Sequence, residues 1–174
     1  GKMFISQNIL QKNGKLTDEE FEIMKTHTTL GYQLCLKDKA LRPYYAGPYY
    51  HHEALDGTGY PQGLLKKDIP YEAQIIRVAD EFDAIVSKRQ YKSHINISDA
   101  LKIIIENTQP SPNAPQGTGF TNAGKNNKLV VKKLISVVLD DTEYEIACTM
   151  NYLKYLKEQI KRLKDIERLI TKMN

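Results

Sequence analysis

HHEALDGTGYPQGL, residues 51–64, is the most informative run of the chain. It joins two adjacent histidines and a glutamate to a turn-forming run from Asp56 to Pro61. Proline suits the first turn of a helix, so Pro48 predicts a short helix that continues through Glu53. The glycines and the proline that follow end this helix in a tight turn. The sequence therefore predicts two imidazole groups on a short helix that a turn closes.

The adjacent histidines His51 and His52 admit two interpretations. Successive helical residues point about 100° apart, so on a helix the pair would offer ligands to two neighbouring ions and would not chelate one. A position near the helix N-terminus would help keep both imidazoles neutral, because the helix dipole disfavours positive charge there. The alternative is that both are ordinary polar residues of a helix surface.

His27 lies on the apolar face of a longer predicted helix. The run from Thr17 to Glu20 is a capping box, which predicts a helix over residues 17–36. Apolar residues recur along it at helical spacing and mark one face: Ile23, Leu30 and Leu34. A histidine among them must either be satisfied by a hydrogen bond or ligate a metal. Both interpretations stay open for His27.

Asp80 lies at the edge of the apolar face of a third predicted helix, residues 71–87, which follows Pro70. The inward side of this helix is expected to comprise Ile75, Val78, Ala79, Phe82, Ile85 and Val86. A carboxylate at that edge is costly unless it binds a cation or hydrogen-bond donors, so Asp80 is a candidate metal ligand. Asp83 lies one turn later and is either a second acid of the site or a surface residue.

Imidazole and carboxylate groups without thiolate suit iron, manganese or zinc at a hydrolytic site. Paired ions suit phosphoester hydrolysis, because they activate water and neutralise phosphate oxygens. Arg89 and Lys92 follow the helix of Asp80. They could hold a phosphate, the arginine through two parallel hydrogen bonds and the lysine as a point charge. Exposed basic residues without a ligand are the alternative, and His94, in a polar loop, is assigned to the surface.

The rest of the chain completes an all-α pattern in three parts, residues 1–107, 108–128 and 129–174. Ser98 is a good N-cap for a helix that carries several apolar residues. The proline, glycine and asparagine residues between 107 and 128 predict a loop or linker. Two helices are expected after it, over 129–139 and 144–173. The second is amphipathic and either packs on the core or pairs with another chain.

Composition excludes several classes of protein. The 174 residues suit one domain with an appendage, and 41% hydrophobic against 26% charged residues exclude wholesale disorder. A net charge of +4 is compatible with an anionic ligand but too small and scattered for DNA binding. No apolar run reaches the ~20 residues that span a bilayer. Cys35 and Cys148 are far apart and in no metal-binding spacing, which fits a reducing cytoplasm.

The run at 51–64 resembles the motif HHExxDGxGYPxGL of the HD-GYP domain family. Neighbouring segments agree in order and spacing. Residues 24–31, MKTHTTLG, are similar to the family segment that carries the preceding histidine. Residues 76–85, IRVADEFDAI, together with Ser87, Arg89 and Tyr91 are similar to its VADxxDAxxSxRxY segment. The resemblance covers about residues 1–107 and leaves the C-terminal helices outside.

The resemblance implies an HD-domain-like helical bundle, with an added C-terminal amphipathic helix, that binds two or three divalent metal ions, iron or manganese first. It implies hydrolysis of cyclic di-GMP to linear pGpG or onward to GMP in bacterial signalling. The residues that match the family's metal ligands are His27, His51, His52 and Asp80. Those that match substrate-binding positions are Lys2, Tyr60, Arg89 and Lys92, and Lys2 and Asp83 match catalytic positions.

In the family a His-Asp pair immediately precedes the position of Gly1, and a further histidine lies upstream, so we expect native residues before Gly1. The alternative is a non-catalytic module that binds cyclic di-GMP or a signalling partner. Another cyclic dinucleotide is a third interpretation, because no residue here reads the base. Two protein contacts are also expected, a signalling protein at Gly59-Tyr60-Pro61 and a second copy of the chain at the C-terminal helix.

Overall fold

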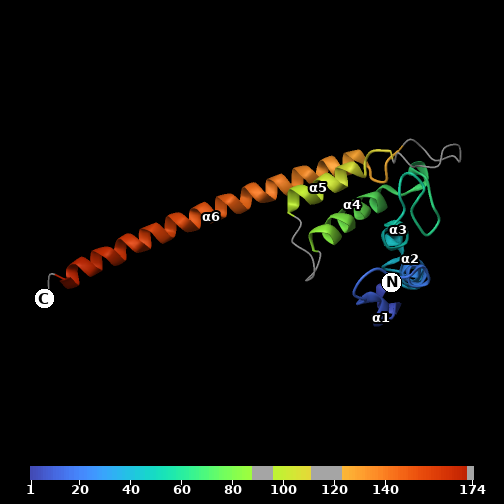
Figure 1. The fold of residues 1–174 in the computed structure, drawn as a ribbon, viewed down its shortest axis with the longest axis horizontal. Helices are drawn as coiled ribbons and strands as arrows, with labels where there is room; N and C mark the ends of the chain where they lie inside the picture. The colour runs from blue at the N-terminus through green and yellow to red at the C-terminus, as the bar shows by residue number, and fades with distance from the viewer. Residues whose placement is uncertain (88–95, 111–122, 172–174) are drawn as a thin grey trace. The chain divides into compact units, whose positions relative to one another are not determined.

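The computed structural model describes residues 1–87, 96–110 and 123–171, the last three of them by their backbone alone. The helices are η1 (Lys2–Phe4), α1 (Gln7–Leu10), α2 (Asp18–Lys37), η2 (Arg42–Tyr44), α3 (Ala46–Tyr50), η3 (Lys66–Asp68), α4 (Tyr71–Val86), α5 (Ile97–Glu106) and α6 (Lys128–Thr171). No strand occurs in these ranges, and an isolated bridge joins Asp56 and Leu65. The predicted all-α fold is confirmed (Figure 1).

The chain divides by its contacts into two units, Gly1–Leu134 and Ile135–Asn174. The first unit holds every helix up to α5 and the first turns of α6, and the second holds the remainder of α6. The predicted division into residues 1–107, 108–128 and 129–174 stays a prediction. No helix in the described ranges has the length and hydrophobicity needed to cross a membrane.

The predicted capping box begins α2. The Thr17 hydroxyl accepts a hydrogen bond from the Glu20 N–H at 3.2 Å, and the Glu20 carboxylate accepts one from the Thr17 N–H at 2.7 Å. The predicted inward face is confirmed at His27, which is buried, and wrong at Ile23 and Leu34, which are 48% and 38% exposed. The buried face is one of smaller side chains around His27: Thr28, Gly31 and Cys35.

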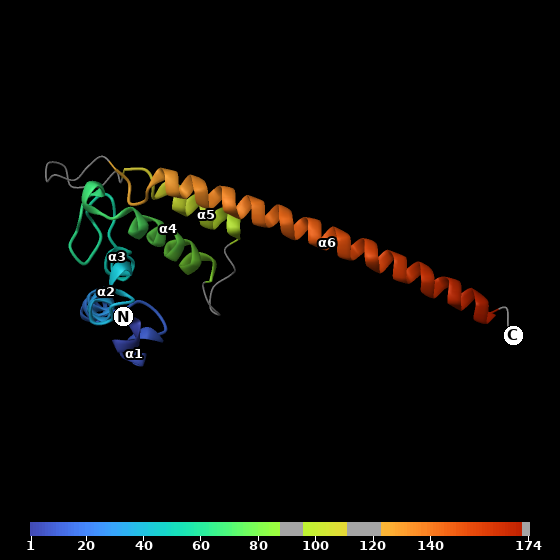
Figure 2. The ribbon, with the colours of Figure 1, turned by 180° about the vertical axis from the view of Figure 1, so that it is seen from behind.

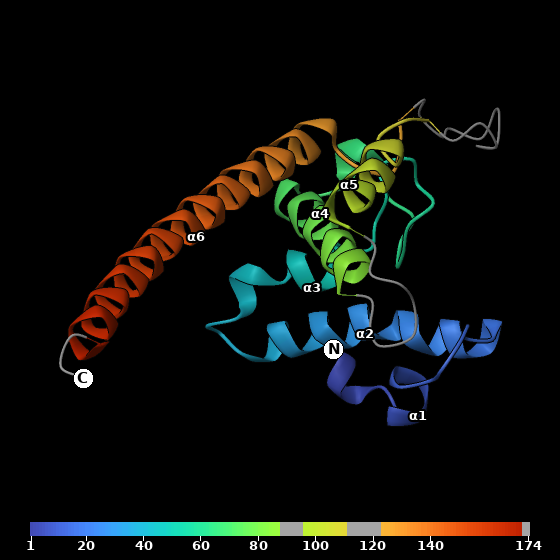
Figure 3. The same ribbon diagram turned by 60° about the vertical axis from the view of Figure 1, so that its left-hand side comes forward.

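Small residues bring the N-terminus and α3 close to α2. A Cβ at Gly31 would lie 3.1 Å from the Pro48 Cβ and 3.4 Å from the Gly1 nitrogen, so this helix face admits near-backbone contact. Gly1 in turn lies against the His27 carbonyl. Figure 3 shows the N-terminus beside the middle of α2. Close packing at Gly31 therefore directs α3, and the histidines that follow it, toward His27.

Helix α3 differs from its prediction at both ends. It begins at Ala46, so Pro48 is its third residue, where the missing N–H is still free of an intrahelical partner. It ends at Tyr50, with His51 as the C-cap and His52 in the following turn. The expected position near a helix N-terminus is therefore wrong, and the helix dipole does not keep these imidazoles neutral.

Helices α4 and α5 pack against each other in the first unit, as both Figure 1 and Figure 2 show. Helix α4 begins directly after Pro70 as predicted, and its buried residues are Ala73, Gln74 and Val78. Ile75 and Ala79, both expected inward, are exposed. The cap of α5 is Asn96 and not Ser98, because the Asn96 side-chain oxygen accepts a hydrogen bond from the Asp99 N–H at 2.9 Å.

The described end of the predicted linker is docked on the first unit. The Leu55 N–H donates to the Lys125 carbonyl at 3.0 Å, and the Asn126 N–H donates to the Asn107 carbonyl at 3.0 Å. Ala123 packs against the apolar cluster of Leu55, Ile69 and Ala73. Residues 123–127, which we call the return segment, therefore support the run at 51–64 before α6 begins.

Helix α6 is continuous from Lys128 to Thr171, so the expected break between residues 139 and 144 is wrong. The intervening run, DDTE at 140–143, contains neither proline nor glycine, so nothing in it stops a helix. The Thr142 hydroxyl finds its hydrogen-bond acceptor within α6, because it donates to the Val138 carbonyl at 2.8 Å.

Candidate metal centre

Three histidines from two segments converge in the first unit. His27 comes from the buried face of α2, and His51 and His52 come from the turn that ends α3. One ring nitrogen from each lies within 4.8 Å of the others. The rings of His51 and His52 are 4.1 Å apart between centroids, and His27 lies 5.3 Å and 5.0 Å from them. The premise that kept the adjacent pair from sharing one ion is wrong, because both rings leave a turn and not a regular helix, and the number of ions stays a prediction.

Backbone carbonyls fix the tautomers of two of these imidazoles. His27 Nδ1 lies 2.7 Å from the Met24 carbonyl oxygen, and His51 Nδ1 lies 3.0 Å from that of Gly47. A carbonyl only accepts, so in the neutral rings both Nδ1 atoms carry the hydrogen and both Nε2 atoms present lone pairs. The two Nε2 atoms are 3.3 Å apart. Two facing lone pairs repel each other, whereas a cation between them would bind both.

Burial keeps the cluster uncharged. It is the main cause that lowers the pKa of His27 and of His51, and it lowers the pKa of His52 to about 3. The neighbouring imidazoles lower the pKa values of His51 and His52 further. Neutral imidazole is the ligating form, so the donor set fits a divalent metal ion at neutral pH.

Asp80 lies within electrostatic reach of the histidines. Its charge opposes the lowering of the pKa of His27 and of His51, and with burial it raises the pKa of Tyr60 to about 12. The side chain is half-buried on α4. Its carboxylate is not among the donors that lie within 4.8 Å of one another. The structure therefore brings three of the four predicted metal ligands together and places the fourth beside them.

Tyr60 covers one side of the cluster. Its ring stacks on His52 with centroids 4.7 Å apart and planes 24° apart. The ring also meets the edge of Phe21 at 6.1 Å, which joins the turn to α2. A pKa of about 12 keeps its hydroxyl protonated, so near neutral pH Tyr60 offers a hydrogen-bond donor and no charge.

The family is decided by a comparison with known proteins. The profile described as "HD domain" matches residues 1–110. The chain belongs to the HD domain family. The match covers the residues that build the histidine cluster and ends at the last described residue before the gap that precedes the return segment.

Characterised relatives of this HD domain carry cyclic-dinucleotide names. A "Cyclic di-GMP phosphodiesterase" of Thermotoga maritima is 44% identical over 106 residues, which are 60% of this chain and 29% of the relative. "Cyclic di-GMP phosphodiesterase response regulator RpfG" of Xanthomonas campestris is 44% identical over 104 residues, 58% of this chain and 27% of the relative. A "3'3'-cGAMP-specific phosphodiesterase 3" of Vibrio cholerae is 37% identical over 107 residues, 62% and 23% of the two chains. The chain thus spans under a third of the length of these relatives, and the predicted resemblance to the HD-GYP family is confirmed.

Of the other predicted site residues, the structure describes Lys2 and Asp83. Lys2, on η1, is exposed, and its charge helps lower the pKa values of His27 and His52, so it stands near them. Asp83 is exposed and accepts a hydrogen bond from the Ser87 hydroxyl at 2.9 Å. Arg89 and Lys92 lie outside the described residues.

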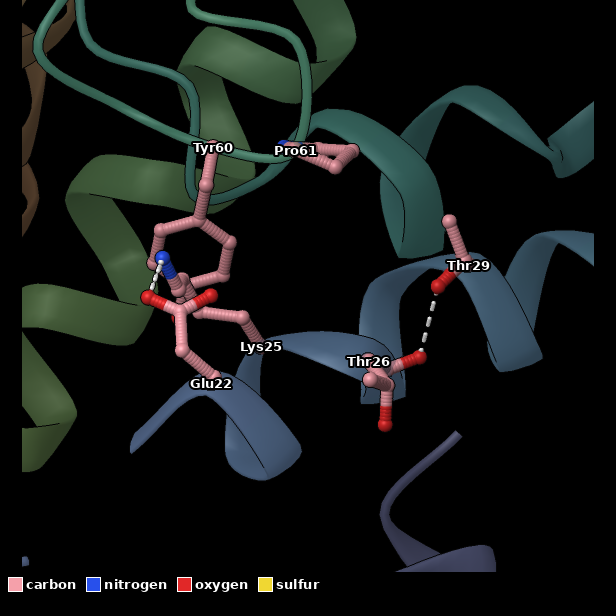
Figure 4. A pocket seen from close by; sticks show the side chains of 6 residues that line it. All are labelled: Glu22, Lys25, Thr26, Thr29, Tyr60 and Pro61. Atoms are coloured by element: carbon pink, nitrogen blue, oxygen red, sulfur yellow. Dashed lines mark hydrogen bonds and ion pairs between the residues drawn. The ribbon is translucent and has the colours of Figure 1, made fainter. Parts of the chain in front are cut away.

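A small open pocket adjoins the Tyr60 side of the HD domain. It has a volume of about 200 Å³ and is lined by one face of α2 and by the turn: Glu22, Lys25, Thr26, Thr29, Tyr60 and Pro61 (Figure 4). The Lys25 ammonium lies 6.0 Å from the centroid of the Tyr60 ring and pairs with the Glu22 carboxylate. The pocket therefore presents an amine, hydroxyl groups and the ring of Tyr60, which also stacks on His52.

A buried carboxylate holds the run at 51–64 in shape. Glu53 is 1% exposed and accepts backbone N–H bonds from Gln62 at 2.6 Å and Leu64 at 2.8 Å. A Cβ at Gly59 would lie 2.2 Å from the Ala54 nitrogen, so only glycine fits there. The motif's glutamate and glycine thus serve the turn that positions Tyr60 against His52.

Arg77, which sequence analysis did not select, joins this turn to the return segment. Its Nη1 donates to the His52 carbonyl at 3.2 Å and its Nε to the Asn126 side-chain oxygen at 3.0 Å. The Asn126 amide donates to Glu81 at 2.6 Å. The sequence held one indication that Arg77 belongs to the site, because it lies one helical turn before Asp80 and Glu81 and shares their side of α4. No pattern distinguishes Asn126 within its polar run.

The metal-free HD domain is expected to lose stability as the pH falls below about 6.5. The pKa values of the three histidines are lower in the folded chain than their ordinary value of 6.5, and that of His52 is about 3. Between these values the unfolded chain binds protons that the folded chain does not, so the free energy of unfolding falls with the pH. Urea unfolding in a chelator at pH 7.5, 6.0 and 5.0 measures this. H52Q should flatten the dependence, and equal stability of the native chain at all three values would contradict the prediction.

Proposed function

We propose that this chain carries the HD-GYP-type part of a metal-dependent phosphodiesterase that hydrolyses cyclic di-GMP to linear pGpG, GMP or both. The observation that carries the proposal is the pair of facing Nε2 atoms of His27 and His51, 3.3 Å apart, with their Nδ1 hydrogens held by backbone carbonyls. The names of the relatives supply the substrate class.

The proposed ligands are His27, His51 and His52, with Asp80 contributing charge or a further ligand. We propose two or three divalent ions, iron or manganese, because imidazole and carboxylate donors without thiolate suit them. Bound ions of this kind supply Lewis acidity toward a phosphate ester. The tautomers of His27 and His51 prepare the site, because both Nε2 atoms already present lone pairs. Near neutral pH neither ring has to release a proton before a metal ion binds.

Other residues of the chain are proposed to bind the substrate. Lys2, near the cluster, would balance the negative charge that develops on the phosphate. Tyr60 would donate its hydroxyl hydrogen at the edge of the site, because its raised pKa keeps that hydrogen in place. Arg89 and Lys92 are proposed to hold the nucleotide, and Asp83 to act as an acid near the site, on the resemblance alone.

Two protein partners and a compartment are also proposed. A signalling protein is proposed to bind the turn of Gly59, Tyr60 and Pro61, and a second copy to bind the C-terminal helix. A cytoplasmic location is proposed from the two separated cysteines. The alternative function is a non-catalytic module that binds a cyclic dinucleotide or a partner, and the Vibrio cholerae relative favours testing 3'3'-cGAMP as well.

Metal content and product analysis test the proposed function together. The chain is loaded with Mn²⁺ or, under anaerobic conditions, with Fe²⁺, and bound metal is measured after gel filtration. Cyclic di-GMP and 3'3'-cGAMP are then added separately, and chromatography follows pGpG and GMP. We expect at least one bound ion per chain and product from cyclic di-GMP. Nucleotide binding without metal or product would support the binding module, and neither binding nor product would contradict both functions.

A further inference from the structure

The described part of the second unit is one helix, in which an apolar residue recurs every seven positions. Along α6 the positions seven apart, which we call the a positions, are Leu139, Ile146, Leu153 and Ile160. The positions three residues after each, the d positions, are Thr142, Thr149, Leu156 and Leu163. A repeat of seven with apolar a and d positions is the pattern of a left-handed coiled coil. The stripe therefore suits another helix and not a flat surface.

The a positions are exposed within this unit. Their side chains are between 50% and 56% exposed, and Leu163 at a d position is 64% exposed. Large apolar side chains occupy all four a positions and the last two d positions, and an exposed stripe of this kind is not a stable surface in water. Most helical stability in proteins comes from packing such a face. The unit Ile135–Asn174 thus presents one half of a helix pair.

Charge along α6 favours a particular direction for the second helix. Residues 140–145 carry four acidic side chains and no basic one. Residues 154–168 carry six basic and three acidic side chains. A parallel partner of the same sequence would place acidic beside acidic and basic beside basic residues. An antiparallel partner of the same sequence instead places the acidic segment beside residues 164–169, whose charges balance and include Lys164 and Arg168, so the repulsion between like segments is removed.

We propose that α6 pairs with α6 of a second copy in antiparallel orientation, with Leu153 packed against Leu156 of the second copy. This inference rests on the proposed contact between two copies and adds its direction and register. In this register Ile146 meets Leu163 of the second copy. Glu143 and Lys164 each directly follow a d position and so flank the apolar seam. In the antiparallel pair Glu143 of one copy lies beside Lys164 of the other, once at each end of the pair. Parallel pairing in register brings neither of these two charges beside the other.

The oligomeric state tests the pairing. The 174-residue chain is measured by light scattering during gel filtration, with L153D as the test and Y155D as the matched control. Both native side chains are about equally exposed, 50% and 53%, but Tyr155 lies off the stripe. We expect dimers of the native chain and of Y155D, and a monomer of L153D. A monomeric native chain, a larger oligomer, or equal effects of the two substitutions would overturn the proposal.

A charge-reversal cycle tests the direction separately. E143K and K164E should each raise the dimer dissociation constant roughly threefold to tenfold, because each places like charges together at both ends of the pair. The double variant E143K/K164E should return the constant to near the native value. A dimer in which the double variant is no better than the single ones would overturn the antiparallel direction while leaving two copies paired. Neither result depends on phosphodiesterase activity.

Discussion

H51A should lower the affinity of the chain for Mn²⁺ by roughly a hundredfold or more and reduce turnover of cyclic di-GMP to background. Loss of an outer partner of a metal ligand typically costs 10–100-fold, and loss of the ligand itself costs more. The reason lies in the facing Nε2 atoms, because removal of one leaves His27 without its opposing donor. Isothermal titration and product chromatography measure the two effects.

A second variant separates ligand loss from structural damage. His51 Nδ1 also contacts the Gly47 and Pro48 carbonyls, so H51A removes a structural bond with the ligand. H51N can keep an N–H donor near those carbonyls but has no counterpart of Nε2. We expect H51N to unfold near the native urea midpoint and yet to bind metal as poorly as H51A. Native-like metal affinity in H51N would refute the assignment of His51 as a ligand.

Two further substitutions compare Asp80 with His51 and with a histidine outside the cluster. D80A should also abolish turnover and reduce bound metal, with a smaller loss of metal affinity than H51A, because the Asp80 carboxylate lies outside the group of three close donors. H94A is the matched control, since the polar sequence around that histidine predicts a surface position. Metal affinity and turnover in H94A should equal those of the native chain, and a loss there as large as in H51A would contradict a cluster limited to the proposed ligands.

Local chemistry made part of the fold predictable from sequence. The capping box at Thr17 and the proline at position 70 each define a helix start through bonds within a few residues, and both helices begin where expected. The run at 51–64 indicated His51 and His52 as candidate ligands because its residues are adjacent in the chain, and their role as ligands stays a prediction. Local signals were not sufficient everywhere, since α3 begins two residues before Pro48 and Asn96, not Ser98, caps α5.

Predictions that needed the packing partner failed. The apolar spacing of α2 favoured Ile23 and Leu34 as core residues, whereas Gly31 admits Pro48 and turns the small-residue face inward. His51 and His52 were expected on a helix, but α3 ends before them. The role of Asn126 depends on a contact with Arg77, 49 residues away in the chain, which no local pattern reveals.

R77M should destabilise the HD domain by about 2–4 kcal/mol, because it removes part-buried hydrogen bonds of a charged donor to acceptors on two segments. The guanidinium bonds the His52 carbonyl and the Asn126 side chain, so its loss acts on the turn and on the return segment together. We expect the urea midpoint to fall in the metal-free chain. Metal affinity should fall as well, because the backbone of His52 loses one of the two N–H donors that hold its carbonyl, the other being the Tyr60 N–H.

The control for this prediction is an arginine that also donates to a carbonyl but at the surface. Arg42 Nη2 bonds the Leu36 carbonyl at 3.0 Å and is exposed, so R42M should change stability by about 0.5 kcal/mol or less and leave metal affinity unchanged. N126A should be intermediate, because it breaks the bond to the return segment and keeps the bond to His52. If N126A lowered metal affinity as much as R77M, the return segment itself would position His52. If neither variant changed it, Arg77 would serve stability alone, and the link from α4 to the histidine cluster would be refuted.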